Sequence, residues 1–280
     1  MPQTPAEQML YTIVKLTAFK GDEPQGTGTG FFYSIDVGGG HTSPWIVTNR
    51  HVVDGCDSIV AICHIADGKT PPGPSNQFVH CRIIFSPHEG LLGHPDPDVD
   101  LCGISTANLL KHGNAAGAPL YFINVAKKDI PSAEDWENFD ALEEVTMVGC
   151  PNGIYDEVNN LPIFRRGTTA SALSKKYNGK DMFVVDMACF PGSSGSPVFI
   201  YNREGFFDRK RNSFVLGASR FFFLGVLFAG PLINNSGQIV LGRPSQVEVA
   251  TMMHLGYVLR STTLLDFENR ILEYHKPKSG

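Results

Sequence analysis

The chain has 280 residues, of which 42% are hydrophobic and 18% are charged, and its net charge is −5 at pH 7. A chain of this length can bury about three quarters of its unfolded surface in one or two hydrophobic cores. The composition therefore excludes an intrinsically disordered protein, and the negative charge gives no reason to expect a nucleic acid partner.

The sequence shows no targeting signal. Residues 1–21 lack the basic start and apolar run of a signal peptide, and the most apolar stretch, residues 221–233, is too short to cross a bilayer. Six cysteines are spread along the chain. Without a secretory signal we expect reduced thiols that mostly fill the core. These features predict a soluble, cytoplasmic protein with no membrane partner.

Strand-like segments dominate the chain. They are short apolar runs separated by clusters of Gly, Pro, Asn and Asp, a pattern typical of an all-β barrel or sandwich. Residues 26–30, GTGTG, are interpreted as a turn that leads into one of these strands. In chain order the expected strands are residues 8–19, 28–36, 45–53, 58–66, 78–85, 99–105, 144–150, 182–188, 197–201, 214–228, 238–241 and 255–261.

Helical patterns are sparse. Residues 105–113 predict a helical turn, and residues 261–275 predict a C-terminal helix with a hydroxyl cap at its start. The apolar face of this helix would consist of Leu264, Leu265, Ile271 and Leu272.

A predicted hairpin carries two cysteines and two histidines. Cys63 and Cys81 would both face the core, while a zinc site made of these thiols with His64 and His80 is the alternative. Adjacent residues of a strand point to opposite faces, so Cys63 and His64 would rarely bind one ion. We therefore expect no metal and no cofactor.

Residues 190–199, FPGSSGSPVF, place three serines within four positions beside Gly192, Gly195 and Pro197. A flexible linker would connect polar stretches, whereas the flanking segments MFVVDMACF and PVFIY are apolar and strand-like. We interpret the segment as a tight turn between two buried strands that exposes one hydroxyl.

A serine hydroxyl needs help to act as a nucleophile at neutral pH. An imidazole must take its proton, and a carboxylate must fix the tautomer of that imidazole. His51 lies in the segment WIVTNRHVV, where an apolar strand ends, and Asp100 opens DLCGI after a proline-rich loop, with Asp98 as the competing carboxylate. A lone histidine or aspartate in such a place is usually structural, so the hypothesis depends on all three groups occurring together.

The three groups occur in the order His, Asp, Ser, which is the order of the chymotrypsin type, whereas α/β-hydrolases have the serine first. The surrounding motifs resemble those of trypsin-like serine proteases of the chymotrypsin fold, and most of all the bacterial HtrA/Deg branch. The motifs that carry this resemblance are GTGFF (28–32), WIVTNRHVV (45–53), DLCGI (100–104) and DMACFPGSSGSPV (186–198), supported by VGCPNG (148–153) and LGYVLRS (255–261).

The resemblance implies a single protease domain over residues 1–280. It would contain two six-stranded antiparallel β-barrels, with the active site between them and a C-terminal helix. The N-terminal barrel would span about residues 10–125, the C-terminal barrel about 126–260, and the helix about 261–275.

The resemblance also implies a role for each site residue. Ser194 would be the nucleophile because it follows Pro-Gly-x and precedes Gly-x-Pro. His51 would act as general base and later as general acid, and Asp100 would orient it. The backbone N–H groups of Gly192 and Ser194 would form the oxyanion hole, where losing one donor typically costs roughly 100- to 1000-fold in rate.

Two neighbouring serines depart from the family pattern. Ser196 stands where the family has a second glycine after the nucleophile. Ser193 stands where secreted relatives have an aspartate that pairs with a newly cut N-terminus. We therefore expect no activation of that kind, and we treat both serines as bystanders.

The specificity pocket can be placed from the same resemblance. Its floor would be Ala188, six residues before the nucleophile, and its walls would come from Phe228, Ala229, Gly230 and the region of Leu255. No carboxylate occurs among them, which favours a small or medium apolar substrate side chain over Arg or Lys.

Two segments near the expected cleft, residues 201–221 and 231–254, look like unusually long loops. We predict that one of them restricts access until a regulatory protein partner or effector binds. No PDZ-like domain is expected. The predicted function is a serine endopeptidase that cleaves protein or peptide substrates. The alternatives are a catalytically silent binding or scaffold module and an esterase that uses the same triad.

Overall fold

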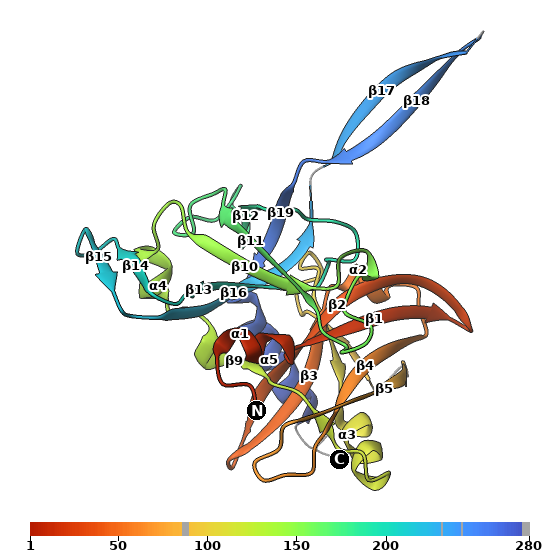
Figure 1. The fold of residues 1–280 in the computed structure, drawn as a ribbon, viewed down its shortest axis with the longest axis vertical. Coiled ribbons are helices and arrows are strands. Elements are labelled where there is room, and N and C mark those ends of the chain that lie inside the picture. Colours follow the sequence, from red (N-terminus) through yellow and green to blue (C-terminus); the bar gives the residue numbers. More distant parts are fainter. Residues whose placement is uncertain (86–89, 231, 242, 276–280) are drawn as a thin grey trace.

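The computed structural model describes residues 1–85, 90–230, 232–241 and 243–275 (Figure 1). Two β structures lie side by side, the first formed by the N-terminal half of the chain and the second by the C-terminal half, and all strand pairs in them are antiparallel except β2 with β9. The predicted all-β fold with a C-terminal helix is confirmed.

The first structure is a nine-stranded sheet in the order β5-β4-β1-β2-β3-β7-β6, with β8 added to β4 and β9 to β2. Six strands carry most of it, and the other three contribute only two or three residues each at its margins. The strands are β1 (Ile13–Lys20), β2 (Glu23–Gly38), β3 (His41–Thr48), β4 (Ser58–Ala66), β5 (Pro74–Ile84), β6 (Leu91–Gly93), β7 (Cys102–Ser105), β8 (Leu120–Tyr121) and β9 (Val125–Ala126).

The second structure is a closed barrel in the order β10-β11-β12-β19-β16-β13, which leaves no open sheet edge. Its interior is filled by large apolar side chains such as Phe183 and Leu224. The barrel strands are β10 (Glu144–Gly149), β11 (Ile163–Thr169), β12 (Met182–Asp186), β13 (Pro197–Asn202), β16 (Arg220–Ala229) and β19 (Leu255–Arg260).

Glycines allow the long strand β2 to pack closely against its neighbours. A Cβ on Gly28 would lie 2.5 Å from Val52 Cγ1, and one on Gly30 would lie 2.7 Å from Ile46 Cγ2. Residues 26–30 therefore lie within β2, so the turn predicted there is wrong. These glycines serve close packing of side chains and are not needed to bend the backbone.

Three short helices lie between strands, and one helix lies at each end of the chain. Each terminal helix packs against the β structure that the other half of the chain forms. The helices are α1 (Pro5–Leu10), α2 (Arg50–Val53), α3 (Ala107–Ala115), α4 (Ala133–Asn138) and α5 (Thr263–His275), with 3₁₀ turns η1 (Lys127–Asp129) and η2 (Pro151–Gly153). Among the helices of the described ranges, none is long and apolar enough to cross a membrane.

The amphipathic helix α5 follows the last barrel strand but packs on the N-terminal sheet. Its Phe267 ring meets the Trp45 ring edge-on at 6.4 Å, and Glu268 accepts a hydrogen bond of 2.5 Å from the buried Tyr33 hydroxyl. A Cβ on Gly103 would lie 2.4 Å from Phe267 Cζ, so only glycine lets this ring approach β7. At the other end of the chain, Met9 of α1 joins the apolar cluster shared by both halves.

The two segments predicted as long loops form β-hairpins. Residues 201–221 contain β14 (Gly205–Asp208) and β15 (Ser213–Leu216). Residues 231–254 contain β17 (Leu232–Leu241) and β18 (Arg243–Met252), a ribbon that projects away from the body in Figure 1, while residues 231 and 242 lie outside the described residues. In the first hairpin the turn signals at 209–212 thus mark its tip.

Candidate active site

Strand register brings the predicted histidine and aspartate together. β3 and β7 are antiparallel neighbours, and Thr48 at the end of β3 pairs with Cys102 at the start of β7. His51 follows β3 in the short helix α2, and Asp100 precedes β7 by two residues. His51 and Asp100 therefore lie at the same end of this strand pair.

Two hydrogen bonds join His51 to Asp100. The imidazole Nδ1 lies 2.5 Å from Asp100 Oδ2, and the backbone N–H of His51 donates to Oδ1 over 3.0 Å. The Asn49 side-chain amide holds the Asp100 carbonyl at 2.7 Å. The competing Asp98 has no hydrogen bond to His51 within the described ranges, and its own N–H donates to Asp96 Oδ1. The geometry thus favours Asp100 as the partner of His51.

The Asp100 carboxylate is held in its ionised form. Burial alone would raise its pKa, but the hydrogen bonds from His51 and the charge of Arg50 outweigh burial and lower the pKa below its ordinary value. An ionised carboxylate can only accept a hydrogen bond, so in a neutral His51 ring the proton sits on Nδ1, which donates to Asp100 Oδ2. Nε2 is then left with a lone pair that can accept a proton.

The segment FPGSSGSPVF forms a tight turn between β12 and β13. The N–H of Ser193 donates to the Phe190 carbonyl over 3.0 Å, with Pro191 and Gly192 at the two central positions. Gly192 has a φ of +80°, which is the left-handed conformation that a type II turn requires after proline. Beyond Ser194, Gly195 also has a positive φ, of +87°.

The amide between Pro191 and Gly192 has a fixed orientation. The backbone N–H of Asn152 donates to the Pro191 carbonyl over 2.6 Å. Because the C=O and N–H of a trans peptide point in opposite directions, the N–H of Gly192 faces away from Asn152. Within the described ranges neither this N–H nor that of Ser194 has a hydrogen-bond partner. Two free donors thus flank the predicted nucleophile.

The serine turn lies against the end of β3, close to the histidine. A Cβ on Gly195 would lie 2.6 Å from Thr48 Oγ1, and Thr48 precedes His51 by only three residues. No hydrogen bond joins His51 Nε2 to Ser194 Oγ in the described part of the chain. Such contacts are often long in unliganded enzymes and tighten when substrate binds. The predicted nucleophile, the predicted base and two unpartnered N–H groups thus come from segments that meet at the border of the two β structures.

Part of the chain matches a known protein family. Residues 28–206 match the family described as the trypsin-like peptidase domain. The chain belongs to the trypsin-like peptidase family. No curated protein matches the chain in sequence.

Two solved structures are similar to the peptidase. The inactive form of the Rv3671c protease has 16% sequence identity and a TM-score of 0.47, and the match covers 97% of this chain and 98% of that one. The serine endoprotease from Yersinia pestis has 13% identity and a TM-score of 0.48, over 97% of this chain and 68% of that one. Identities this low carry no information about substrates.

The residues predicted for the specificity pocket gather at one end of the peptidase barrel. Asp186 pairs with Leu255 and Ala229 pairs with Tyr257, so the ends of β12, β16 and β19 lie side by side. Ala188 follows β12 and is half-buried, and the Phe228 ring lies 6.3 Å from the Tyr257 ring. Gly230, which directly follows β16, is also half-buried.

One cation lies near this group of residues. The Arg165 guanidinium sits 4.9 Å above the Phe190 ring, and His254 meets the same ring edge-on at 5.9 Å. Phe190 immediately precedes the serine turn.

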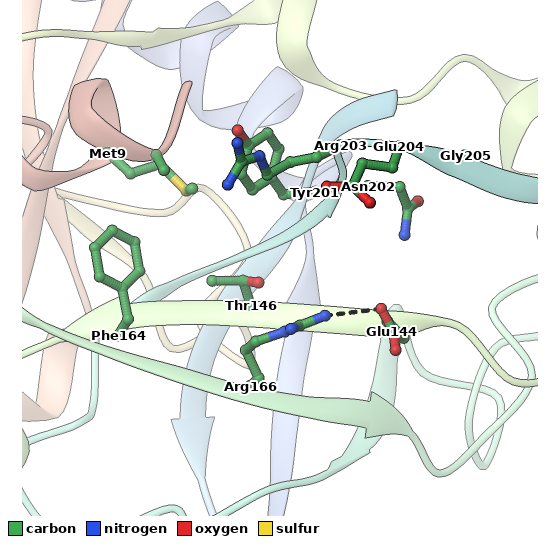
Figure 2. Close-up of a pocket in the computed structure, with 11 residues that line it drawn as sticks. Met9, Glu144, Thr146, Phe164, Arg166, Tyr201, Asn202, Arg203, Glu204 and Gly205 are labelled. Atoms are coloured by element: carbon green, nitrogen blue, oxygen red, sulfur yellow. Dashed lines mark hydrogen bonds and ion pairs between the residues drawn. The ribbon is translucent and has the colours of Figure 1, made fainter. Parts of the chain in front are cut away.

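A separate cavity of about 480 Å³ lies away from these residues, between α1 and the outer face of β10, β11 and β13. Figure 2 shows Met9 and Phe164 at one side of it and the Glu144–Arg166 ion pair at another. It contains none of the predicted site residues.

Sequence reasoning missed the residues that hold the site in place. Asn49 fixes the backbone of Asp100, and Asn152 fixes the amide of Gly192, but neither was assigned a role. Both occur inside motifs that carried the family resemblance, WIVTNRHVV and VGCPNG. The motifs therefore contained a signal, although their residue types alone did not indicate the contacts.

The zinc alternative receives no support from the hairpin that was predicted to carry it. β4 and β5 pair as expected, with Cys63 opposite Val79 and Ala61 opposite Cys81. His64 is buried, and its Nε2 donates to the Asn160 carbonyl over 3.0 Å. No group of three potential metal ligands occurs within the described ranges.

Proposed function

We propose that the protein is a serine endopeptidase that cleaves protein or peptide substrates through Ser194, His51 and Asp100. The observation that carries the proposal is the bonding of His51 to Asp100 through two hydrogen bonds, beside a serine turn with two free N–H donors. Membership of the trypsin-like peptidase family supports peptide-bond hydrolysis as the reaction class.

In the proposed first step, the Ser194 hydroxyl attacks the carbonyl carbon of the substrate. His51 Nε2 takes the hydroxyl proton, and the ionised Asp100 stabilises the imidazolium that forms. The carbonyl oxygen becomes an oxyanion, which accepts hydrogen bonds from the N–H groups of Gly192 and Ser194. The imidazolium then protonates the leaving amine, and Ser194 remains as an acyl ester.

In the second step, water hydrolyses this ester by the same route in reverse. His51 removes a proton from the water, the hydroxide adds to the acyl carbon, and the two N–H donors again stabilise the oxyanion. Collapse of this intermediate returns the proton from His51 to Ser194 and releases the acid product. Apart from water and the substrate, these proposed steps use only groups of the chain.

We propose an apolar side chain at the cleaved residue of the substrate. Phe228, Ala229, Gly230, Leu255 and the floor residue Ala188 offer no charge to a substrate side chain. The Arg165 guanidinium beside Phe190 would repel lysine or arginine. The free thiols of all six described cysteines support a reducing compartment, and we propose the cytoplasm as the location.

A fluorophosphonate probe tests the proposal, because it phosphonylates only an activated serine. The wild type should react, and Ser194→Ala should not. Asp100→Asn should lower the rate of peptide cleavage by about 10⁴-fold, as expected when the tautomer is no longer held. Asp98→Asn is the matched control, since Asp98 does not bond to His51, and it should remain close to the wild type.

Two results would count against the proposal. Labelling that survives Ser194→Ala would remove Ser194 as the nucleophile. A folded wild type that neither reacts with the probe nor cleaves labelled casein would favour the alternative of a silent binding or scaffold module.

A further inference from the structure

Thr29 is fully buried in the middle of β2, at the border between the N-terminal sheet and the barrel. Its backbone N–H donates to the Ser194 carbonyl over 2.9 Å. Its own carbonyl accepts a hydrogen bond of 2.8 Å from Thr48 Oγ1, close to His51. The backbone of this residue therefore touches both sides of the candidate active site.

The hydroxyl of Thr29 makes two further hydrogen bonds, both to the barrel. It accepts from the backbone N–H of Cys150 over 2.9 Å, and it donates to the Gly192 carbonyl over 3.1 Å. A hydroxyl has one hydrogen to donate and lone pairs to accept with, so both bonds can exist at once. Thr29 Oγ1 is thus hydrogen-bonded both to the segment that follows β10 and to the serine turn.

These bonds fix the amides on both sides of Gly192. Asn152 holds the Pro191 carbonyl, and Thr29 holds the Gly192 carbonyl. Cys150 lies only two residues before Asn152, so the Thr29 hydroxyl also helps to place the donor that holds Pro191. With both carbonyls held, the N–H of Gly192 has one direction left to point.

The serine next to the nucleophile does not supply such a restraint. Ser193 is fully buried, and its hydroxyl has no hydrogen-bond partner within the described ranges. Its backbone N–H closes the turn, but its side chain holds no carbonyl. The Thr29 hydroxyl is the side chain that bonds directly to this turn in the described residues.

We propose that Thr29 is a positioning residue of this peptidase, whose hydroxyl holds the Gly192 amide in the orientation that stabilises the oxyanion. The inference rests on the proposed function, because it concerns the rate of the reaction at Ser194. Thr29 does not touch the reacting atoms. It acts through Gly192 and through the segment of Cys150 and Asn152.

A pair of substitutions separates the hydroxyl from the rest of the side chain. Thr29→Val keeps the shape and both backbone bonds but removes the hydroxyl, and Thr29→Ser keeps the hydroxyl. The Val variant should lower kcat on a fluorogenic peptide with an apolar residue at the cleaved bond by about 100-fold, as expected for a misplaced oxyanion donor. KM should change little, and the Ser variant should retain most of the activity.

A second readout follows the oxyanion site itself. A peptide boronic acid forms a tetrahedral adduct with the serine, so its affinity should fall for Thr29→Val in parallel with kcat/KM. Measurements are made below the thermal midpoint of every variant, as established by circular dichroism. If the Val variant does not fold, Thr29→Ala, which also lacks the hydroxyl, takes its place.

Several results would overturn the inference. They are an unchanged kcat for Thr29→Val, a Ser variant as impaired as the Val variant, or a rise in KM alone. Each of these with a wild type that reacts with the fluorophosphonate would leave the proposed function intact. A wild type that does not react would overturn both.

Discussion

Gly149 and Ser196 are packed so closely that a single added methyl group should destabilise the fold. Both residues are buried, Gly149 at the end of β10 and Ser196 just before β13. A Cβ on Gly149 would lie 2.0 Å from Ser196 Oγ and 3.0 Å from Ser196 Cβ, and 2.9 Å from Thr29 Oγ1. The first of these distances is far below any van der Waals contact, so Gly149→Ala must displace Ser196.

The size of the effect can be estimated from overpacked cores. Inserting a methyl group into a filled core typically costs about 1–3 kcal/mol, and the overlap here places Gly149→Ala at the upper end, at about 3 kcal/mol. For a chain of this size that loss should lower Tm by roughly 6 °C. Urea unfolding followed by circular dichroism measures the free energy of unfolding directly.

The second half of the prediction is a rescue by Ser196→Gly. The Ser196 hydroxyl has no hydrogen-bond partner within the described ranges, so removing it alone should change stability by no more than about 1 kcal/mol. In the double variant the two contacts with Ser196 disappear, and only the 2.9 Å contact with Thr29 Oγ1 remains. The double variant should therefore recover at least half of the loss. Strictly additive losses would refute this account of the packing.

Two further predictions concern the N-terminal sheet and the β14–β15 hairpin. Burial lowers the pKa of His64 below its ordinary value of about 6.5. Between these two pKa values the unfolded chain binds a proton that the folded chain does not. The free energy of unfolding should therefore fall as the pH drops through this range, by at most about 1.4 kcal/mol per pH unit. Urea unfolding at pH 7.5 and 5.5 should show a smaller difference for His64→Gln than for the wild type or for the exposed control His41→Gln, and equal differences in all three would contradict the assignment. Deleting residues 205–212 removes β14 together with the ion pair from Lys210 to Glu134, and if this hairpin restricts access it should speed the cleavage of labelled casein. An unchanged rate in a folded deletion variant would exclude this hairpin as the restricting element.

The pairing of His51 with Asp100 could be predicted from the sequence. Each residue sits at the end of an apolar strand, and a short motif surrounds each one, so local pattern places both side chains at strand ends. The register between Thr48 and Cys102 that aligns them is a tertiary feature, but the family resemblance supplied it indirectly.

The role of Thr29 could not be predicted from local pattern. Its hydroxyl meets Cys150 and Gly192, which lie more than a hundred residues further along the chain. The glycines around it were read as turn residues, whereas they lie in an extended strand because Val52 and Ile46 need the space that a side chain would fill. A glycine signals either backbone freedom or close approach, and the sequence alone does not say which.

The hairpins that were read as loops show a related ambiguity. Polar residues such as the run at 209–212 favour a long loop when the sequence is considered alone. In the structure Asn212 has a φ of +46° and lies in the turn between β14 and β15. β14 and β15 have only four residues each, which is too short for an alternating pattern to stand out, although residues 214–216 of β15 fall within the expected strand 214–228.

The helices at the two ends of the chain bind the two β structures to one another in a reciprocal way. α1 leads into the first sheet, yet its Met9 and Ala6 lie beside β10, β11 and β13 of the barrel. α5 follows the barrel, yet its Phe267 and Glu268 pack on the first sheet. Neither β structure can move away from the other without breaking the packing of one of these helices. The two halves should therefore move as one body, and any change in access to Ser194 must come from segments on the surface of that body.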